Sequence, residues 1–235
     1  YFFMRSLSNS DLENFEEALK DLDKAIDLDP TISKYFYQRA LNKGDLKKYQ
    51  ESLDDFNKAI NLNLRDTDYF YFRGKSNYFL KNLKKAEEDY NSAIELDSMN
   101  IEALNSLGRI NVEKHNYDAA INISNQSINI NANDNNDAYR IRGISKLMLG
   151  EFSEALEDFN WIINANPNLE YGWTNRGLYF EKIGEYEKSI EDYNVAIKIN
   201  PKNSLIYTNK GISNSKLENY KEAIKDFDKA IKLNP

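Results

Sequence analysis

The dipeptide Ala-Ile recurs along the chain at a fixed interval of 34 residues. The copies in this register begin at Ala25, Ala59, Ala93, Ala196 and Ala230. One additional residue near position 133 shifts the phase between the third and fourth of these copies. The apolar residues around each copy recur at three and four positions, as in a helix, and do not alternate as in a strand. This period is typical of stacked helix–turn–helix repeats, in which each helix pair buries its apolar face only against its neighbours.

Residues 170–205 show one repeat most clearly. The first helical pattern ends near Gly184, where a residue with positive φ is easily accommodated. A second pattern begins directly afterwards and ends before Pro201, because proline cannot continue a helix and disfavours it in the preceding residue. We therefore expect two antiparallel helices per repeat, joined by a short turn.

Small residues at fixed positions are expected to let the helices approach closely. Gly177 on the first helix and Ser189 on the second should face each other, and Ala196 should contact the next repeat in the same way. A larger side chain there would overpack the contact, at a cost of about 1–3 kcal/mol. The small position of the first helix recurs as Ser6, Ala40, Gly74, Gly108, Gly143, Gly177 and Gly211. A large position on the second helix recurs as Leu22, Phe56, Tyr90, Ser124, Phe159, Tyr193 and Phe227.

This pattern resembles that of the tetratricopeptide repeat (TPR) family, whose repeats combine an aromatic residue, Leu-Gly, Tyr, Ala, a second aromatic, Ala and Pro. The resemblance covers essentially the whole chain. It implies an all-α, right-handed superhelical solenoid of antiparallel helix–turn–helix repeats, forming a single domain of residues 1–235. The seven repeats span approximately 1–32, 33–66, 67–100, 101–135, 136–169, 170–203 and 204–235.

The fourth repeat departs most from the others. Ser124 and Ser127 stand where the other repeats carry mostly an aromatic residue and an alanine, and the following segment is one residue longer and lacks proline. Losing a buried aromatic side chain costs roughly 3–5 kcal/mol if nothing refills the space. We therefore expect a softer joint at 124–137. Drift within one tolerant repeat is the alternative.

The first helices of such a solenoid are expected to line its concave face. The candidate peptide-binding residues on this face are Phe3, Met4, Leu7, Tyr37, Gln38, Leu41, Tyr71, Phe72, Lys75, Arg109, Arg140, Asn175 and Asn209. The amino-terminal members are aromatic or apolar, and such residues anchor partners well. Alternatively, they pack on one another.

Asn175 and Asn209 occupy equivalent positions in adjacent repeats. A side-chain amide offers both a donor and an acceptor, so the pair could hold an extended peptide backbone. Chance is the alternative, because asparagine is abundant in this chain. Some TPR domains grip a terminal carboxylate with a set of Lys, Asn and Arg side chains. No three consecutive repeats here complete that set, so we do not expect such a clamp.

The charge balance argues against a nucleic-acid partner. The net charge is −7, and basic residues are interleaved with acidic ones rather than forming a stripe. We expect most charges, including Asp158, to lie on a solvated outer face. No apolar run approaches the roughly 18 residues that a membrane span requires, so we predict no membrane insertion. The absence of cysteine excludes disulfides and thiolate metal ligands.

No set of residues suggests catalysis, a metal site or a cofactor. His115 is the only histidine, and one histidine makes neither a metal site nor a triad. Acidic runs such as Asp54-Asp55 and Glu87-Glu88-Asp89 are expected on the outer surface of second helices, with no cleft to desolvate them.

We therefore predict a non-catalytic module that binds a peptide or protein segment in its groove. One alternative is an assembly platform that self-associates through the convex face or the repeat ends, where Ala223, Phe227 and Ala230 would be partly uncovered. Another is a recognition arm of a larger enzyme.

Overall fold

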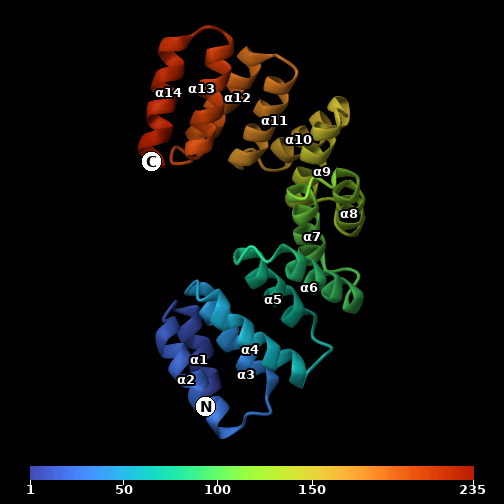
Figure 1. The fold of residues 1–235 in the computed structure, drawn as a ribbon, viewed down its shortest axis with the longest axis vertical. Coiled ribbons are helices and arrows are strands. Elements are labelled where there is room, and N and C mark those ends of the chain that lie inside the picture. The colour runs from blue at the N-terminus through green and yellow to red at the C-terminus, as the bar shows by residue number, and fades with distance from the viewer. The chain divides into compact units, whose positions relative to one another are not determined.

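The computed structural model describes residues 1–235, which form fourteen α-helices and no strands (Figure 1). The helices are α1 (Phe2–Asp11), α2 (Phe15–Leu28), α3 (Ser33–Asp45), α4 (Tyr49–Leu62), α5 (Thr67–Phe79), α6 (Leu83–Leu96), α7 (Ile101–Glu113), α8 (Tyr117–Ile130), α9 (Asn136–Leu149), α10 (Phe152–Ala165), α11 (Glu170–Lys182), α12 (Tyr186–Ile199), α13 (Ser204–Lys216) and α14 (Tyr220–Leu233). Odd-numbered helices are the first helices of the repeats and even-numbered helices the second. The predicted all-α repeat fold is confirmed.

The chain forms two compact units, Tyr1–Ile110 and Asn111–Pro235, with the division inside α7. In each unit a first helix packs on the second helix of its own repeat and on that of the preceding repeat, as α5 does on α6 and α4. Consecutive first helices also touch, as α3 does α5 in the first unit and α9 does α11 in the second. The first helices therefore form a continuous surface within each unit.

The turn between the two helices of every repeat contains one residue with positive φ. Gly150 and Gly184 fill this position in two repeats, with φ of 84° and 83°, as expected for Gly184. The other five turns use residues with side chains, namely Glu13, Lys47, Lys81, His115 and Glu218. His115 is thus a turn residue, and its Nδ1 lies 2.7 Å from the hydroxyl of Tyr117.

The core of each repeat is a large side chain of the second helix pressed against the small residue of the first. A Cβ placed on Gly177 would lie 2.5 Å from Cε1 of Tyr193, so only glycine leaves room for that ring. Tyr193 is thus the side chain nearest to Gly177, and the predicted contact between Gly177 and Ser189 stays a prediction. The Ser189 hydroxyl donates to Ser213 Oγ on the next first helix, at 2.7 Å. Ala196 packs with Ile206 of the next repeat, as predicted.

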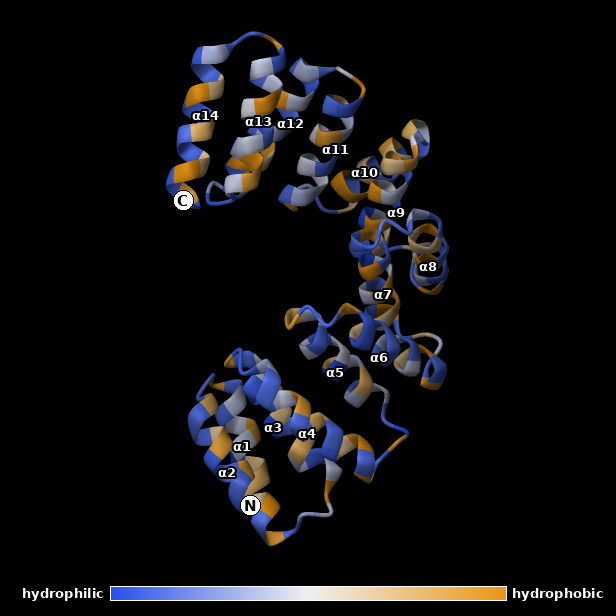
Figure 2. Ribbon diagram, viewed as in Figure 1, coloured by the Kyte–Doolittle hydropathy of each residue, from blue (hydrophilic) through white to orange (hydrophobic).

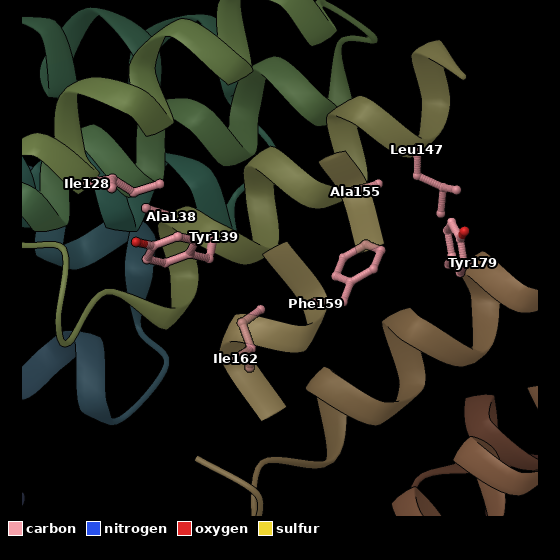
Figure 3. Packing of buried hydrophobic residues seen from close by; sticks show 8 residues of the cluster. All are labelled: Ile128, Ala138, Tyr139, Leu147, Ala155, Phe159, Ile162 and Tyr179. Carbon is pink, nitrogen blue, oxygen red and sulfur yellow. The ribbon is translucent and has the colours of Figure 1, made fainter. Parts of the chain in front are cut away.

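Hydrophobic residues recur between hydrophilic ones along the helices (Figure 2). Hydrophobic side chains of neighbouring helices meet in clusters such as the one formed by Ile128, Ala138, Tyr139, Leu147, Ala155, Phe159, Ile162 and Tyr179 (Figure 3). In this cluster Leu147 of α9 points toward the ring of Tyr179 on α11. The ring of Trp161 lies flat on that of Tyr139, with centroids 3.8 Å apart, so this tryptophan packs within its own repeat.

Two serines on the second helix of the fourth repeat are buried, with 1% of Ser124 and 0% of Ser127 exposed. Asn135 connects α8 to α9, because its Nδ2 donates to Ser127 O at 3.0 Å while its Oδ1 accepts from the backbone N–H of Ala138 at the start of α9. A softer joint at 124–137 stays a prediction.

Candidate functional site

A pocket of about 240 Å³ opens between the first helices α3 and α5. Both helices, the turn after α3 and the second helix α4 contribute its lining: Ala40, Leu41, Gly44, Asp45, Lys47, Tyr49, Phe56, Phe72, Lys75, Ser76 and Phe79. The structure thus brings together three of the predicted groove residues, Leu41, Phe72 and Lys75. We call this the α3/α5 pocket.

A second pocket, of about 290 Å³, opens between the first helices α9 and α11 of the other unit. Its lining consists of Ile144, Leu147, Met148, Phe159, Asn175, Leu178, Glu181 and Lys182. We call this the α9/α11 pocket. Of the predicted residues, only Asn175 belongs to it.

The two pockets occupy the same place in the repeat. Phe56 in the first corresponds to Phe159 in the second, and Phe72 corresponds to Asn175, each pair being 103 residues apart. The same geometry, a gap between consecutive first helices backed by an aromatic ring of a second helix, therefore occurs in both units.

One carboxyl group in each pocket has a raised pKa. Burial raises the pKa of Asp45, and the nearby Lys75 opposes that shift. The Lys75 ammonium also lies 5.6 Å from the centre of the Phe72 ring. In the other pocket, burial raises the pKa of Glu181, which accepts a hydrogen bond from the Tyr193 hydroxyl at 3.2 Å.

Asn175 is buried, with 8% of its surface exposed, and its Nδ2 has no hydrogen-bond partner within the chain. Leaving a buried donor unsatisfied costs about 1–3 kcal/mol. Asn209, at the equivalent position of the next repeat, is 7% exposed. A ligand group therefore reaches the Asn175 amide only by entering the pocket.

Two of the predicted aromatic residues are packed mainly against other rings. The ring of Tyr37 lies 4.8 Å from that of Tyr69 and 5.9 Å from that of Phe72, and burial raises the pKa of its hydroxyl far above the usual range. The ring of Tyr71 lies 5.9 Å from that of Tyr90. For Tyr37 and Tyr71 the structure therefore shows the packing that we considered as the alternative.

The remaining predicted residues of the first two repeats lie outside the α3/α5 pocket. Met4 is 65% exposed, and Phe3 packs against Tyr35 with ring centres 5.0 Å apart. Leu7 and Gln38 are half-buried. These side chains could contact a partner only outside that pocket.

Arg109 and Arg140 are both half-buried. Burial raises the pKa of Tyr90, and Arg109 opposes that shift electrostatically. Arg140 pairs with Asp137 at 3.1 Å, and its guanidinium lies 5.7 Å from the centre of the Tyr171 ring on the next first helix.

Sequence reasoning missed a row of ion pairs that joins the two helices of six repeats. The residue before the small position of the first helix is basic and pairs with an aspartate 16 positions further on. The pairs are Arg5–Asp21, Arg39–Asp55, Arg73–Asp89, Arg142–Asp158, Arg176–Asp192 and Lys210–Asp226. The six aspartates are between 3% and 7% exposed. In the fourth repeat, Leu107 and Ile123 occupy the corresponding positions.

The expectation that Asp55, Asp89 and Asp158 lie on a solvated outer surface is therefore wrong. Each turns inward, where an arginine satisfies its charge, and a paired buried carboxylate is a structural group rather than a catalytic one. The constant spacing between the basic residue and the aspartate is the signal that could have revealed them.

The carboxy-terminal end of the chain agrees with the expectation of partly uncovered residues at Phe227 but not at Ala223 and Ala230. Ala223 and Ala230 are buried and Phe227 is half-buried, whereas Tyr220, Ile224 and Ile231 on α14 are about 60% exposed. No group of three or more His, Asp or Glu side chains is arranged to hold a metal ion. None of the helices is both long and apolar enough to cross a membrane.

Models of the tetratricopeptide repeat match residues 1–32, 67–98, 101–134, 171–203 and 204–235. Among solved structures, a tetratricopeptide repeat protein from Parabacteroides merdae is 19% identical, with a TM-score of 0.86 over 100% of this chain and 92% of that chain. PilF from Pseudomonas aeruginosa is 17% identical, with a TM-score of 0.72 over 86% and 92%. YrrB is 23% identical, with a TM-score of 0.54 over 77% and 92%.

At these identities the likeness to solved structures shows the fold alone. No curated protein sequence gives a significant match. The repeat matches cover more than half of the chain and coincide with the helix pairs described above. The chain therefore belongs to the tetratricopeptide repeat family, whose members serve as scaffolds for protein–protein interaction.

Proposed function

We propose that this chain is a non-catalytic module that binds an extended peptide or protein segment along its first helices. The observation that carries the proposal is the recurrence of the same pocket in both units, between α3 and α5 and between α9 and α11. A partner segment would place one side chain in each pocket that it reaches. Gaps between rigid, packed helices are well suited to this, because the chain does not reorganise to open them.

The Asn175 amide supports a backbone contact in the α9/α11 pocket. Its Nδ2 is buried and lacks an acceptor within the chain, while the surrounding lining is mostly apolar. A peptide carbonyl would supply that acceptor and remove the cost of the unsatisfied donor. Among the solved structures with this fold, YrrB is described as having an unusual peptide-binding site.

The test begins with a displayed library of random peptides selected on the whole chain. Binding of the selected peptides is then measured to Phe72→Ala, Asn175→Ala and Gln50→Ala variants. Gln50 is exposed on a second helix and serves as the control. We expect at least one of the first two variants to lose about tenfold or more in affinity, as for an interface anchor. Peptides that bind both variants as tightly as the control would contradict the groove proposal, provided that thermal melts show all variants folded.

A second candidate function is self-association. It is favoured by the apolar side chains of Tyr220, Ile224 and Ile231, which form an exposed stripe on α14. Exposed apolar surfaces of this kind commonly mark interfaces. Light scattering over a concentration series tests self-association. The molar mass of this chain is expected to rise with concentration, whereas that of an Ile224→Lys variant is expected to stay constant. A constant monomer mass for both proteins would remove this candidate.

A further inference from the structure

The α3/α5 pocket has aromatic walls and an open space beside Gly44, where its counterpart carries Leu147. Phe56, Phe72 and Phe79 contribute to the lining, and the Phe79 ring stacks on that of Tyr49 with centres 4.8 Å apart and planes 14° apart. A Cβ added to Gly44 would meet no atom within 4 Å. The volume of about 240 Å³ exceeds the cavity of about 150 Å³ that suffices for one benzene ring in an apolar protein interior. An aromatic side chain therefore fits the pocket in size and in chemistry.

The charges around the pocket favour an acidic neighbour for that side chain. Lys47 and Lys75 line it together with a single acid, Asp45, although the chain as a whole carries a net charge of −7. The Lys75 ammonium already lies over the Phe72 ring, in the position that a cationic ligand would take. A basic side chain would therefore meet both an occupied ring face and two like charges.

We propose that the α3/α5 pocket receives an aromatic side chain that is flanked by acidic residues in the partner segment. The ring would enter between Phe72 and Phe79, and the flanking carboxylates would meet Lys47 and Lys75. This inference rests on the proposed peptide-binding function and specifies the chemical class of segment that one of the two pockets takes.

The α9/α11 pocket differs in most of these features, although Phe159 keeps the ring that corresponds to Phe56. Leu147 stands in place of Gly44, Leu178 in place of Lys75, and Asn175 in place of Phe72. Leu147 therefore occupies space next to α9 that is open next to α3, although the α9/α11 pocket as a whole is no smaller, at about 290 Å³. Its lining has one lysine, Lys182, and one acid, Glu181. An aromatic residue with acidic neighbours is expected to prefer the α3/α5 pocket, so binding of such a segment responds to variants in the first unit only.

The experiment uses three fluorescently labelled peptides of equal length and the whole chain. The first has a central phenylalanine between glutamates, the second has alanine in place of the phenylalanine, and the third has lysines in place of the glutamates. Affinity is measured by fluorescence anisotropy at low and at moderate salt. We expect the first peptide to bind at least about tenfold more tightly than either of the others, and the difference from the third to shrink as salt screens the charges.

Three variants locate the site. Gly44→Leu copies Leu147 into open space and fills the pocket without removing a contact, and we expect it to weaken the first peptide by about tenfold or more. Lys34→Leu places the same side chain on an exposed position of α3 outside the pocket and should leave affinity unchanged. Lys75→Glu should weaken the first peptide and strengthen the third.

The proposal is overturned if the lysine peptide or the alanine peptide binds as well as the first. If Gly44→Leu still weakens the better peptide, the groove function stands and only the chemical class is wrong. If neither Gly44→Leu nor Phe72→Ala changes the binding of any peptide, the proposed class of segment is contradicted, and so is the use of this pocket for peptide binding. Thermal melts of each variant show that the loss is not due to unfolding.

Discussion

Arg176 forms a bidentate ion pair with Asp192, in which Nε donates to Oδ2 at 2.8 Å and Nη2 donates to Oδ1 at 2.9 Å. Its third nitrogen, Nη1, donates to Asn160 Oδ1 at 2.8 Å, and Asn160 lies on the second helix of the preceding repeat. One guanidinium thus joins three helices. The fork geometry matches a carboxylate in a way that a lysine cannot reproduce.

Removing the carboxylate should destabilise the chain. In Asp192→Ala the arginine keeps its charge but loses its partner while its side chain is only 22% exposed, so we expect a loss of about 2–4 kcal/mol. The matched control is Glu17→Ala, which breaks the exposed Lys20–Glu17 pair and should change the free energy of unfolding much less, because water screens an exposed pair. Urea unfolding followed by circular dichroism measures both. Similar losses in the two variants would mean that the buried pair contributes no more than a surface pair.

Two glycines with opposite surroundings should respond in opposite directions to alanine. A methyl group on Gly177 would lie 2.5 Å from the Tyr193 ring, so Gly177→Ala is expected to cost about 1–3 kcal/mol. A methyl group on Gly44 meets nothing within 4 Å, and alanine is the better helix former, so Gly44→Ala should stabilise by about 0.5–1 kcal/mol. Thermal unfolding compares the two. A destabilised Gly44→Ala variant would show that the space beside α3 is not open.

Glu181 should make stability depend on pH in a defined direction. Burial raises its pKa above the ordinary value of 4.5, so the folded state disfavours the charged carboxylate. Its contribution is fully favourable below the unfolded pKa and is lost as pH rises through the folded pKa. Glu181→Gln keeps an acceptor for Tyr193 and should stabilise the chain at pH 7 by about 0.5 kcal/mol or less, since the group is partly exposed.

The advantage of Glu181→Gln should disappear as the pH is lowered toward 4.5, because the wild-type carboxyl then takes up a proton. Melting temperatures of the two proteins at several pH values give the measurement. A variant whose advantage grows on acidification would show that the carboxylate is stabilised by its surroundings, with Lys216 as the nearby charge that opposes the effect of burial.

The segment 124–137 should exchange its amide protons faster than the equivalent segments of the repeats on either side. Ser124 stands where most other repeats have an aromatic residue, and its buried hydroxyl has no hydrogen-bond partner within the chain. The second helix of this repeat therefore contributes less apolar packing at this position. Hydrogen–deuterium exchange resolved by mass spectrometry compares the segments directly. Equal protection would support drift within a tolerant repeat.

The sequence predicts the helix pairs well because their period, turn positions and small residues are local patterns repeated many times. Gly184 illustrates this, since its positive φ follows from its place after a helix. The close contact of Gly177 with the Tyr193 ring was not predicted, because helical spacing alone does not tell which side chain of the second helix lies nearest to the glycine. The ion pairs were missed because a charged residue on an amphipathic helix ordinarily faces water, and only its distant partner makes burial favourable.

The candidate site was predictable only in part. Phe72 and Lys75 were identified from their place on the first helix, and the structure brings both into one pocket. The open volume of the pocket depends on the absence of a side chain at Gly44. Such a volume cannot be predicted from the pattern of hydropathy along the sequence. Tyr37 was assigned to the ligand-facing surface because it occupies the same position in its first helix as Tyr71 does in the next repeat. Its ring packs against those of Tyr69 and Phe72.

Arg39 binds Asp55 of its own repeat and also Asp23 of the preceding repeat, as Arg176 also binds Asn160 of its preceding repeat. These contacts affect how unfolding spreads along the chain. When a repeat unfolds, the arginine of the following repeat loses the side chain that it contacted in the unfolded repeat. The unfolding of one repeat therefore destabilises the next, which was otherwise intact. Leu107 and Ile123 replace the arginine and the aspartate in the fourth repeat, so no such arginine connects the fourth repeat to the third. The connection between the fourth and fifth repeats is kept, because Arg142 Nη1 donates to Asn125 Oδ1 at 2.7 Å. Unfolding of the third repeat is therefore not transmitted to the fourth through this type of contact.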